Sequence, residues 1–235
     1  MPARLRVMSY NIRNGRGADG RVDLGRIADV IASYDPDIVA LQEVDAGRPR
    51  SGSVDQAADL GARLGLAVEY AVCVERGCER YGIATLTRLP VIETRHIELP
   101  SVSHRRSEPR RALVTRLEWP APGATLAVVN THLSILGAER PAQIAMIASE
   151  LDADEVIVAG DLNCTPWSPA MKPLRSRLKS ATRRARTWPA RLPVIPLDHI
   201  LYAGKLDVLE AGTWRGAAAR RASDHLPVVA LLEAA

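Results

Sequence analysis

Polar residues that can bind a metal ion or transfer a proton stand where the apolar segments of this 235-residue sequence end. Carboxylate and amide oxygens are the ligands that a hard ion such as Mg²⁺ or Mn²⁺ prefers. Two histidines close to several acids are suited to proton transfer. The residues that form this pattern are Asn11, Glu43, His132, Asp161, Asn163, Asp198, Asp224 and His225.

The patterns of several other reaction classes are missing from the sequence. It contains no Cys/His cluster of the zinc type, no Gly-rich Walker loop and no Gly-x-Ser-x-Gly turn for a serine nucleophile. The chemistry that remains is metal-assisted hydrolysis, in which water rather than a side chain acts as the nucleophile.

The segments that position these residues alternate between expected strands and helices. Because no linker or repeat interrupts the chain, we expect one domain over residues 1–235. The simplest packing is two sheets face to face with helices outside, a four-layer α/β/β/α sandwich whose strand ends bring the polar residues together. Apolar runs bounded by turn residues predict strands over 5–10, 38–41, 67–74, 81–87, 91–99, 112–117, 125–130, 156–159, 200–202, 206–209 and 226–232, and helical spacing predicts helices over 23–34, 55–64 and 137–151.

The composition is that of an ordinary globular protein, with 47% apolar and 25% charged residues. No stretch is long and apolar enough to span a membrane, and no signal peptide is recognisable, so we expect a cytoplasmic protein without a membrane partner. The three cysteines agree with a reducing compartment, since an odd number leaves one thiol unpaired. A disulfide between Cys73 and Cys78 is the alternative if their loop brings them together.

Basic residues are clustered, although the formal net charge is only +4. Such clusters favour a phosphate-bearing or polyanionic partner, nucleic acid among them, and the alternative is a solvated surface. No obligate protein partner is evident. One cluster has eight basic and no acidic residues between positions 172 and 191, and a second comprises Arg105, Arg106, Arg110 and Arg111.

The order of the polar segments resembles the endonuclease/exonuclease/phosphatase superfamily, which includes pancreatic-type deoxyribonuclease. Each piece is short, but seven pieces occur in the family order. The resemblance implies a deoxyribonuclease-like fold and a divalent-metal-dependent phosphoester hydrolase. The matching pieces are Ser9-Tyr10-Asn11-Ile12-Arg13, Leu41-Gln42-Glu43-Val44, Tyr81-Gly82, Asn130-Thr131-His132-Leu133, Gly160-Asp161-Leu162-Asn163, Leu197-Asp198-His199-Ile200 and Ser223-Asp224-His225-Leu226-Pro227.

The same resemblance implies a metal site for Mg²⁺ or Mn²⁺. Glu43 resembles the principal ligand, and Asn11 would assist it or orient water. Asp224 would be a further ligand or lie beside the metal.

Catalytic roles also follow from the resemblance. His225 would act as general base or phosphate stabiliser, with Asp198 orienting it. Asp161 and Asn163 would position water and phosphate. His132 would bind a phosphoryl oxygen or protonate the leaving group.

Other residues have weaker counterparts in the family. Glu79 resembles the acid that partners the equivalent of His132 in deoxyribonuclease. Tyr81, Arg110 and Arg111 are candidates for substrate binding, with packing or solvent as the alternative. No family role matches His199, which we interpret as structural.

Departures from the family pattern reduce the number of activities that we expect for this protein. Arg13 stands where abasic-site endonucleases carry an acid, and the signature of inositol polyphosphatases is absent. We expect a phosphodiesterase acting on nucleic acid or a nucleotide-like substrate. The alternatives are a phosphoesterase for phospholipids or sugar phosphates and a catalytically silent binding module.

Overall fold

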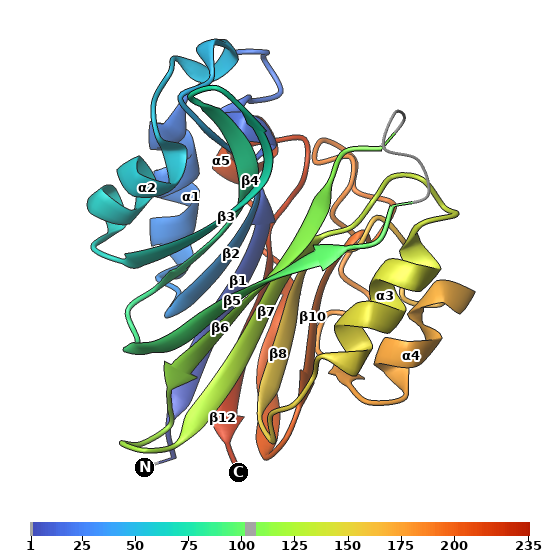
Figure 1. Ribbon diagram of the computed structural model, residues 1–235. Helices are drawn as coiled ribbons and strands as arrows, with labels where there is room; N and C mark the ends of the chain where they lie inside the picture. The colour runs from blue at the N-terminus through green and yellow to red at the C-terminus, as the bar shows by residue number, and fades with distance from the viewer. Residues whose placement is uncertain (1, 102–106) are drawn as a thin grey trace.

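Two six-stranded sheets lie face to face with helices on both outer sides, as the computed structural model of this protein shows (Figure 1). The structure describes residues 2–101 and 107–235, so Arg105 and Arg106 of the second basic cluster lie outside the described residues. The predicted four-layer α/β/β/α sandwich is confirmed.

The first sheet has the strand order β11-β12-β1-β2-β4-β3. Its strands β1 and β2 run parallel and its other neighbours are antiparallel. Helices α1, α2 and α5 cover its outer face (Figure 1). The bounds are β1 Arg4–Asn11, β2 Ile38–Ala46, β3 Ala67–Arg76, β4 Glu79–Thr87, β11 Leu206–Thr213, β12 Val228–Ala234, α1 Leu24–Tyr34, α2 Gln56–Leu64 and α5 Ala217–Ala222.

The second sheet has the strand order β5-β6-β7-β8-β10-β9. Here β7 and β8 form the parallel pair. Helices α3 and α4 pack on its outer face (Figure 1). The bounds are β5 Val91–Leu99, β6 Arg110–Glu118, β7 Thr125–His132, β8 Val156–Asp161, β9 Lys179–Ser180, β10 Asp198–Ala203, α3 Arg140–Ser149 and α4 Lys172–Arg175.

The alternation of side chains along the strands explains why the layers form. In β1, Val7 faces the second sheet while Met8 faces α1, and both are fully buried. Neighbouring β2 repeats this arrangement with Ile38 and Val39. Since successive strand residues point to opposite faces, two apolar faces per strand require a layer on each side.

Both parallel pairs end at the same edge of the sandwich. Asn11 ends β1, while His132 and Asp161 end β7 and β8. The two chain termini lie at the opposite end of the molecule (Figure 1). The polar residues predicted to converge therefore share the edge remote from the termini.

Some elements differ from those predicted. The short helices α4 and α5 and the strand β9 were not expected, nor were the 3₁₀ turns at Arg13–Gly15, Pro49–Ser51 and Pro169–Met171. Helix α3 begins at Arg140 instead of residue 137, and β11 continues to Thr213. The last strand begins at Val228 because Pro227 has no N–H for a ladder.

The cysteines and the helices bear on two further sequence predictions. Cys73, Cys78 and Cys164 are all free, so the alternative of a Cys73–Cys78 disulfide is not realised. Across the described residues, no helix has the length and apolarity needed to cross a membrane.

Candidate active site

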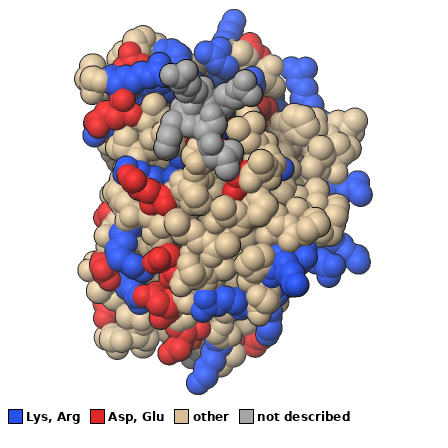
Figure 2. All heavy atoms as spheres, turned by 45° about the vertical axis from the view of Figure 1, so that its right-hand side comes forward, with Lys and Arg blue, Asp and Glu red and all other residues tan. Residues whose placement is uncertain are grey.

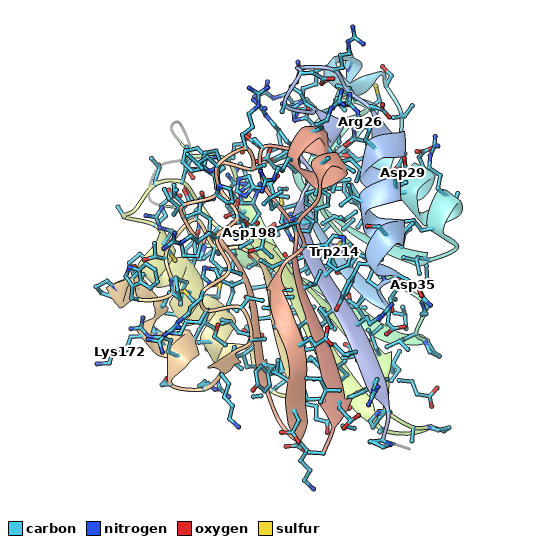
Figure 3. The ribbon with its side chains drawn as sticks, turned by 180° about the vertical axis from the view of Figure 1, so that it is seen from behind. Arg26, Asp29, Asp35, Lys172, Asp198 and Trp214 are labelled. Atoms are coloured by element: carbon cyan, nitrogen blue, oxygen red, sulfur yellow. The ribbon has the colours of Figure 1, made fainter. Side chains whose placement is uncertain are left out.

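A cleft of about 330 Å³ lies at the edge where the parallel strands end. Predicted residues from four strands or strand ends line it together with an apolar wall. Its lining comprises Glu43, His132, Asp161, Asn163 and His225, with Ile135, Trp188, Ile195 and Leu197. Asp198 lies beside it at the upper end of β10 (Figure 3).

Asn11 joins two carboxylates in this cleft. Its Nδ2 donates to Glu43 Oε1 at 2.9 Å and to Asp161 Oδ2 at 3.0 Å. Its Oδ1 accepts from the backbone N–H of Arg13 at 3.0 Å. The buried amide therefore orients Glu43 and Asp161, with its oxygen turned toward the backbone.

A β-bulge presents Glu43 to the cleft. The pairing of β2 with β4 shifts between Leu41 and Val44, and Glu43 has a φ of +58°. A left-handed backbone at a non-glycine residue costs about 1–3 kcal/mol and occurs where the surrounding structure enforces it. Burial raises the pKa of the Glu43 carboxyl, although the hydrogen bond from Asn11 opposes this effect.

His225 and Asp198 form a buried pair. The Nδ1 of His225 lies 2.9 Å from Asp198 Oδ2, and its Nε2 lies 3.8 Å from Asp161 Oδ2. Burial acts to lower the pKa of His225, but the charges of Asp198 and Asp161 outweigh it and raise this pKa to about 10. Because Nδ1 donates to Asp198, Nε2–H of the imidazolium points into the cleft.

Ser223 anchors the turn that carries His225. Its hydroxyl donates to the carbonyl of Asn11 at 2.8 Å and accepts from the N–H of His225 at 3.3 Å. This side chain therefore ties the C-terminal turn to the end of β1.

His132 is neutral, in contrast to the protonated His225. Its Nδ1 lies 3.0 Å from Nη1 of Arg110, which can only donate, so Nδ1 must accept and Nε2 carries the proton. Burial lowers the pKa of His132 well below its ordinary value, and the charge of Arg110 lowers it further. The ring is a neutral imidazole whose Nε2–H lies 3.6 Å from Asp161 Oδ2.

Asp161 occupies the centre of the cleft. One of its oxygens faces Asn11, His132 and His225 together. Burial and the nearby charge of Asp198 raise the pKa of Asp161 to about 7. A carboxyl group with a pKa near neutrality can exchange a proton with water under ordinary conditions.

Asn163 and Asp224 hold different positions around the cleft. The Asn163 N–H donates to Asp161 Oδ1 at 2.9 Å, and its Nδ2 donates to the carbonyl of Leu133 at 2.9 Å. Asp224 lies 3.4 Å from Nε of Arg13 and lines an adjoining hollow rather than the cleft itself. Its charge reaches Glu43, because it contributes to the raised pKa of that residue.

The three candidate substrate-binding residues contact other side chains of the protein. Tyr81 is buried, with the guanidinium of Arg48 at 5.7 Å and that of Arg50 at 5.5 Å from its ring centre. Arg110 is buried against His132, and Arg111 bonds to Glu98 on β5 at 2.6 Å.

The structure also shows the surroundings of Glu79 and His199. Glu79 lies 3.6 Å from Arg48, while Arg110 holds the Nδ1 of His132, so the acid–histidine pair suggested for Glu79 is not formed. His199 is fully buried with its Nε2 at 2.9 Å from the carbonyl of Cys164, which is a structural contact.

The sequence also contained supporting residues that only the structure reveals. Asn130 accepts from Gln42 at 2.9 Å and donates to the carbonyls of Leu41 and Ala84, which fastens the two sheets together below the cleft. The register of the sheets determines this contact, so the local sequence could not specify it.

Glu43 and the neighbouring acids have the chemistry of a hard-cation site. Desolvation disfavours the charge on Glu43, and a divalent cation would compensate for it. Asp161, Asp198 and His225 also place ligand atoms within 4.8 Å of one another. In that group, His225 Nδ1 and Asp198 Oδ2 share a hydrogen bond, whereas the buried Oδ1 of Asp198 has no hydrogen-bond partner among the described residues.

A four-layer sandwich with acids and histidines in a cleft at one edge is the architecture of a class of phosphoester hydrolases. Comparison with known proteins identifies the family. The model of the "Endonuclease/Exonuclease/phosphatase family" matches residues 8–225. The chain therefore belongs to the endonuclease/exonuclease/phosphatase family, which includes metal-dependent phosphoesterases and nucleases.

Similar sequences and solved structures are consistent with this family assignment. The uncharacterized protein YbhP of Escherichia coli K12 is 31% identical over 253 residues, covering 96% of this chain and 95% of YbhP. A family protein from Beutenbergia cavernae has a TM-score of 0.79 at 24% identity, covering 99% of this chain and 72% of that structure. The human Nocturnin catalytic domain has a TM-score of 0.75 at 22% identity, covering 99% of this chain and 95% of that structure. ANGEL2, described as a 2′,3′-cyclic phosphatase, has a TM-score of 0.78 at 18% identity, covering 99% of this chain and 95% of that structure.

Proposed function

We propose that the protein is a Mg²⁺- or Mn²⁺-dependent phosphodiesterase that hydrolyses nucleic acid or a nucleotide-like substrate. The observation that carries this proposal is the arrangement around Asp161 Oδ2, which a neutral imidazole at 3.6 Å and a cationic imidazole at 3.8 Å both face. Two N–H donors beside one carboxylate suit a phosphoryl group whose negative charge shifts during attack by water.

In this proposal Glu43 holds the cation, and Asp224 contributes from the neighbouring hollow. Asn11 orients the Glu43 carboxylate through its Nδ2. The cation supplies Lewis-acid stabilisation of phosphoryl charge when it is bound.

The histidines bind the phosphate in the proposed reaction. Both present an Nε2–H to the cleft, so each donates a hydrogen bond to a phosphoryl oxygen. Asp198 keeps His225 protonated, and Arg110 keeps His132 neutral with its proton on Nε2. His225 is thus a phosphate stabiliser in its resting state rather than a base.

Asp161 accepts the proton from water in this scheme. Its raised pKa makes its carboxylate basic enough for that step near neutral pH. Asn163, held against Leu133 and Asp161, positions the water and the phosphate.

One observation favours a second candidate, a phosphoester that carries an apolar group, such as a phospholipid. Ile135, which is 71% exposed, lines the cleft, and Leu192, which is 73% exposed, lines the hollow that contains Asp224. Exposed apolar side chains grouped around a site can bind an apolar part of a ligand. Comparing nucleic acid with phosphatidylinositol phosphates as substrates separates the two candidates.

The test of the proposal is hydrolysis of bis(p-nitrophenyl) phosphate with Mg²⁺ or Mn²⁺ and with EDTA. We expect turnover that requires the metal and that Glu43→Gln abolishes, because the neutral amide binds a hard cation poorly. The matched control is Glu75→Gln, since Glu75 is an exposed acid on β3 that lies outside the cleft and has no ion pair among the described residues. Folding of both variants is checked by circular dichroism.

Two results would contradict the proposal. Hydrolysis that persists in Glu43→Gln at the same metal concentration removes Glu43 from the mechanism. A folded wild-type protein that hydrolyses no phosphoester with either metal supports a silent binding module instead.

A further inference from the structure

A second pocket lies outside the cleft, between the loop that follows β9 and the end of β11. Its volume is about 410 Å³. The loop side is fixed by backbone bonds, since the N–H of Ala181 donates to Ile200 and that of Ala185 to Thr182. The lining comprises Ala181, Thr182, Arg183, Arg184, Ala185, Ala211, Gly212, Thr213 and Arg215.

Three guanidinium groups line this pocket, and none of the described residues contributes a carboxylate to it. Arg183, Arg184 and Arg215 are all exposed, and no Asp or Glu oxygen of the described residues lies within 4.0 Å of them. Elsewhere, arginines on the surface such as Arg63 and Arg88 pair with nearby acids at 2.6–2.7 Å. The guanidinium fork matches the geometry of phosphate oxygens, so an unpaired group of three favours a phosphate-bearing ligand.

The sequence around this pocket is basic, and the molecule has a surface region where Lys and Arg stand without acidic neighbours. Figure 2 shows Lys and Arg projecting from the right-hand edge without Asp or Glu beside them, whereas charges of both signs mix on the left. The sequence from residue 172 to 191 contains no acid. Lys172 itself projects away from Asp198 (Figure 3), so only part of the basic segment lies near the cleft.

The pocket is connected to the cleft through a few residues. Thr213 Oγ1 donates to the carbonyl of Arg186 at 3.0 Å, which joins the two sides of the pocket. The N–H of Leu226, which follows His225, donates to the carbonyl of Thr187 at 3.0 Å, and Trp188 lines the cleft. The four residues from Arg184 to Trp188 span at most about 14 Å, so the pocket lies within a few nucleotides' reach of the cleft.

We propose that this pocket is an accessory phosphate site for a polynucleotide whose scissile phosphodiester occupies the cleft. The proposal rests on the proposed function of the cleft and names its substrate as a polymer. A substrate with a single phosphoester group fills the cleft alone, whereas a polymer also carries phosphates that can occupy the pocket, so the site would favour long substrates over short ones.

The test compares two triple variants with the same loss of charge. Arg183→Gln/Arg184→Gln/Arg215→Gln removes the pocket charges. Arg76→Gln/Lys172→Gln/Lys205→Gln is the control, because these three residues are also exposed and have no ion pair within the described residues. Neither set contains a residue that lines the cleft.

Binding of a labelled single-stranded oligonucleotide of about 20 nucleotides is measured by fluorescence anisotropy in EDTA at several salt concentrations. At about 0.7 per phosphate contact, the slope of log K against log salt becomes shallower by about 2 in the pocket variant. The control variant keeps the wild-type slope. Thymidine 5′-monophosphate loses no affinity in either variant, because it carries no second phosphate to place in the pocket while the first occupies the cleft.

Several outcomes would overturn the proposal or separate it from the cleft's function. Equal slopes in the two triple variants would refute the accessory site. Loss of binding to phosphatidylglycerol vesicles, with oligonucleotide binding unchanged, would reassign the pocket to anionic membranes. Hydrolysis of bis(p-nitrophenyl) phosphate should be retained by the pocket variant. Metal-dependent hydrolysis by a wild-type protein that binds no oligonucleotide refutes the accessory site alone, whereas a shallower slope in a protein without hydrolysis refutes the proposed function alone.

Discussion

Replacing Asp198 with asparagine should change the pH at which His225 loses its proton. The Nδ1 of His225 lies 2.9 Å from a buried carboxylate oxygen, and asparagine keeps the size and an acceptor oxygen but removes the charge. Because burial alone lowers the pKa of His225, the protonated state depends on Asp198 and Asp161. The variant therefore tests which charge maintains the imidazolium.

The magnitude follows from the separation of the charges. Two unit charges about 4 Å apart at an effective dielectric constant of about 20 interact by about 4 kcal/mol, which corresponds to about 3 pKa units. The pKa of His225, raised to about 10 in the native protein, then falls to about 7. At about pH 8 roughly one tenth of the variant would be protonated, against nearly all of the wild type, whereas at about pH 6 both are mostly protonated.

The assay is kcat/KM for bis(p-nitrophenyl) phosphate across this pH range at saturating metal. We expect a deficit of Asp198→Asn that is small near pH 6 and at least about tenfold near pH 8. Titration of the imidazole by NMR in metal-free protein provides an independent value, and Asp207→Asn on exposed β11 is the control. A deficit that does not vary with pH, together with an unchanged His225 titration, would refute this explanation.

Three further predictions concern other links between structure and function. Arg110→Met should raise the pKa of His132, because only burial and the charge of His225 then lower it, and an unchanged His132 titration by NMR would contradict the role of Arg110 at Nδ1. The rate should rise with pH through about 7 as Asp161 ionises, and Asp161→Asn should remove this limb from the pH–rate profile; a limb retained in the variant would exclude Asp161 as its source. Ile157→Ala, between the two sheets, should cost about 2–5 kcal/mol in urea unfolding, and a loss below about 1 kcal/mol would contradict its packed position.

The arrangement of the cleft could be predicted in outline because strand ends meet at one edge of a sheet. Glu43, His132 and Asp161 each follow an apolar run and His225 precedes one, and these positions at strand ends made their convergence predictable before any contact was known. The sandwich followed from the same apolar runs, since a strand with two apolar faces needs a layer on each side. Helix α5 was missed because its six residues are alanine and arginine, without an apolar periodicity.

The protonation states could not be predicted, because they depend on partners that are distant in the sequence. Arg110 and Arg111 are adjacent and identical in type, yet one holds His132 and the other bonds to Glu98. Only the pairing of β6 with β7 and β5 decides which arginine meets the histidine. The assignment of Glu79 to His132 failed for the same reason, since Arg48 holds that carboxylate near the β3–β4 turn.

His132 has Arg110 at its Nδ1, where the family resemblance had suggested the acid Glu79, and this difference has a chemical consequence. A carboxylate on Nδ1 would favour an imidazolium, as Asp198 does for His225, whereas a guanidinium forces a neutral ring. Both histidines then donate from Nε2, but only His225 carries a charge. Asp161 lies between them with a pKa near neutrality and can gain a proton. Proton acceptance and phosphate binding are therefore divided between different residues, so a substitution that makes His132 cationic should raise affinity for the anionic ground state without raising the rate of attack by water.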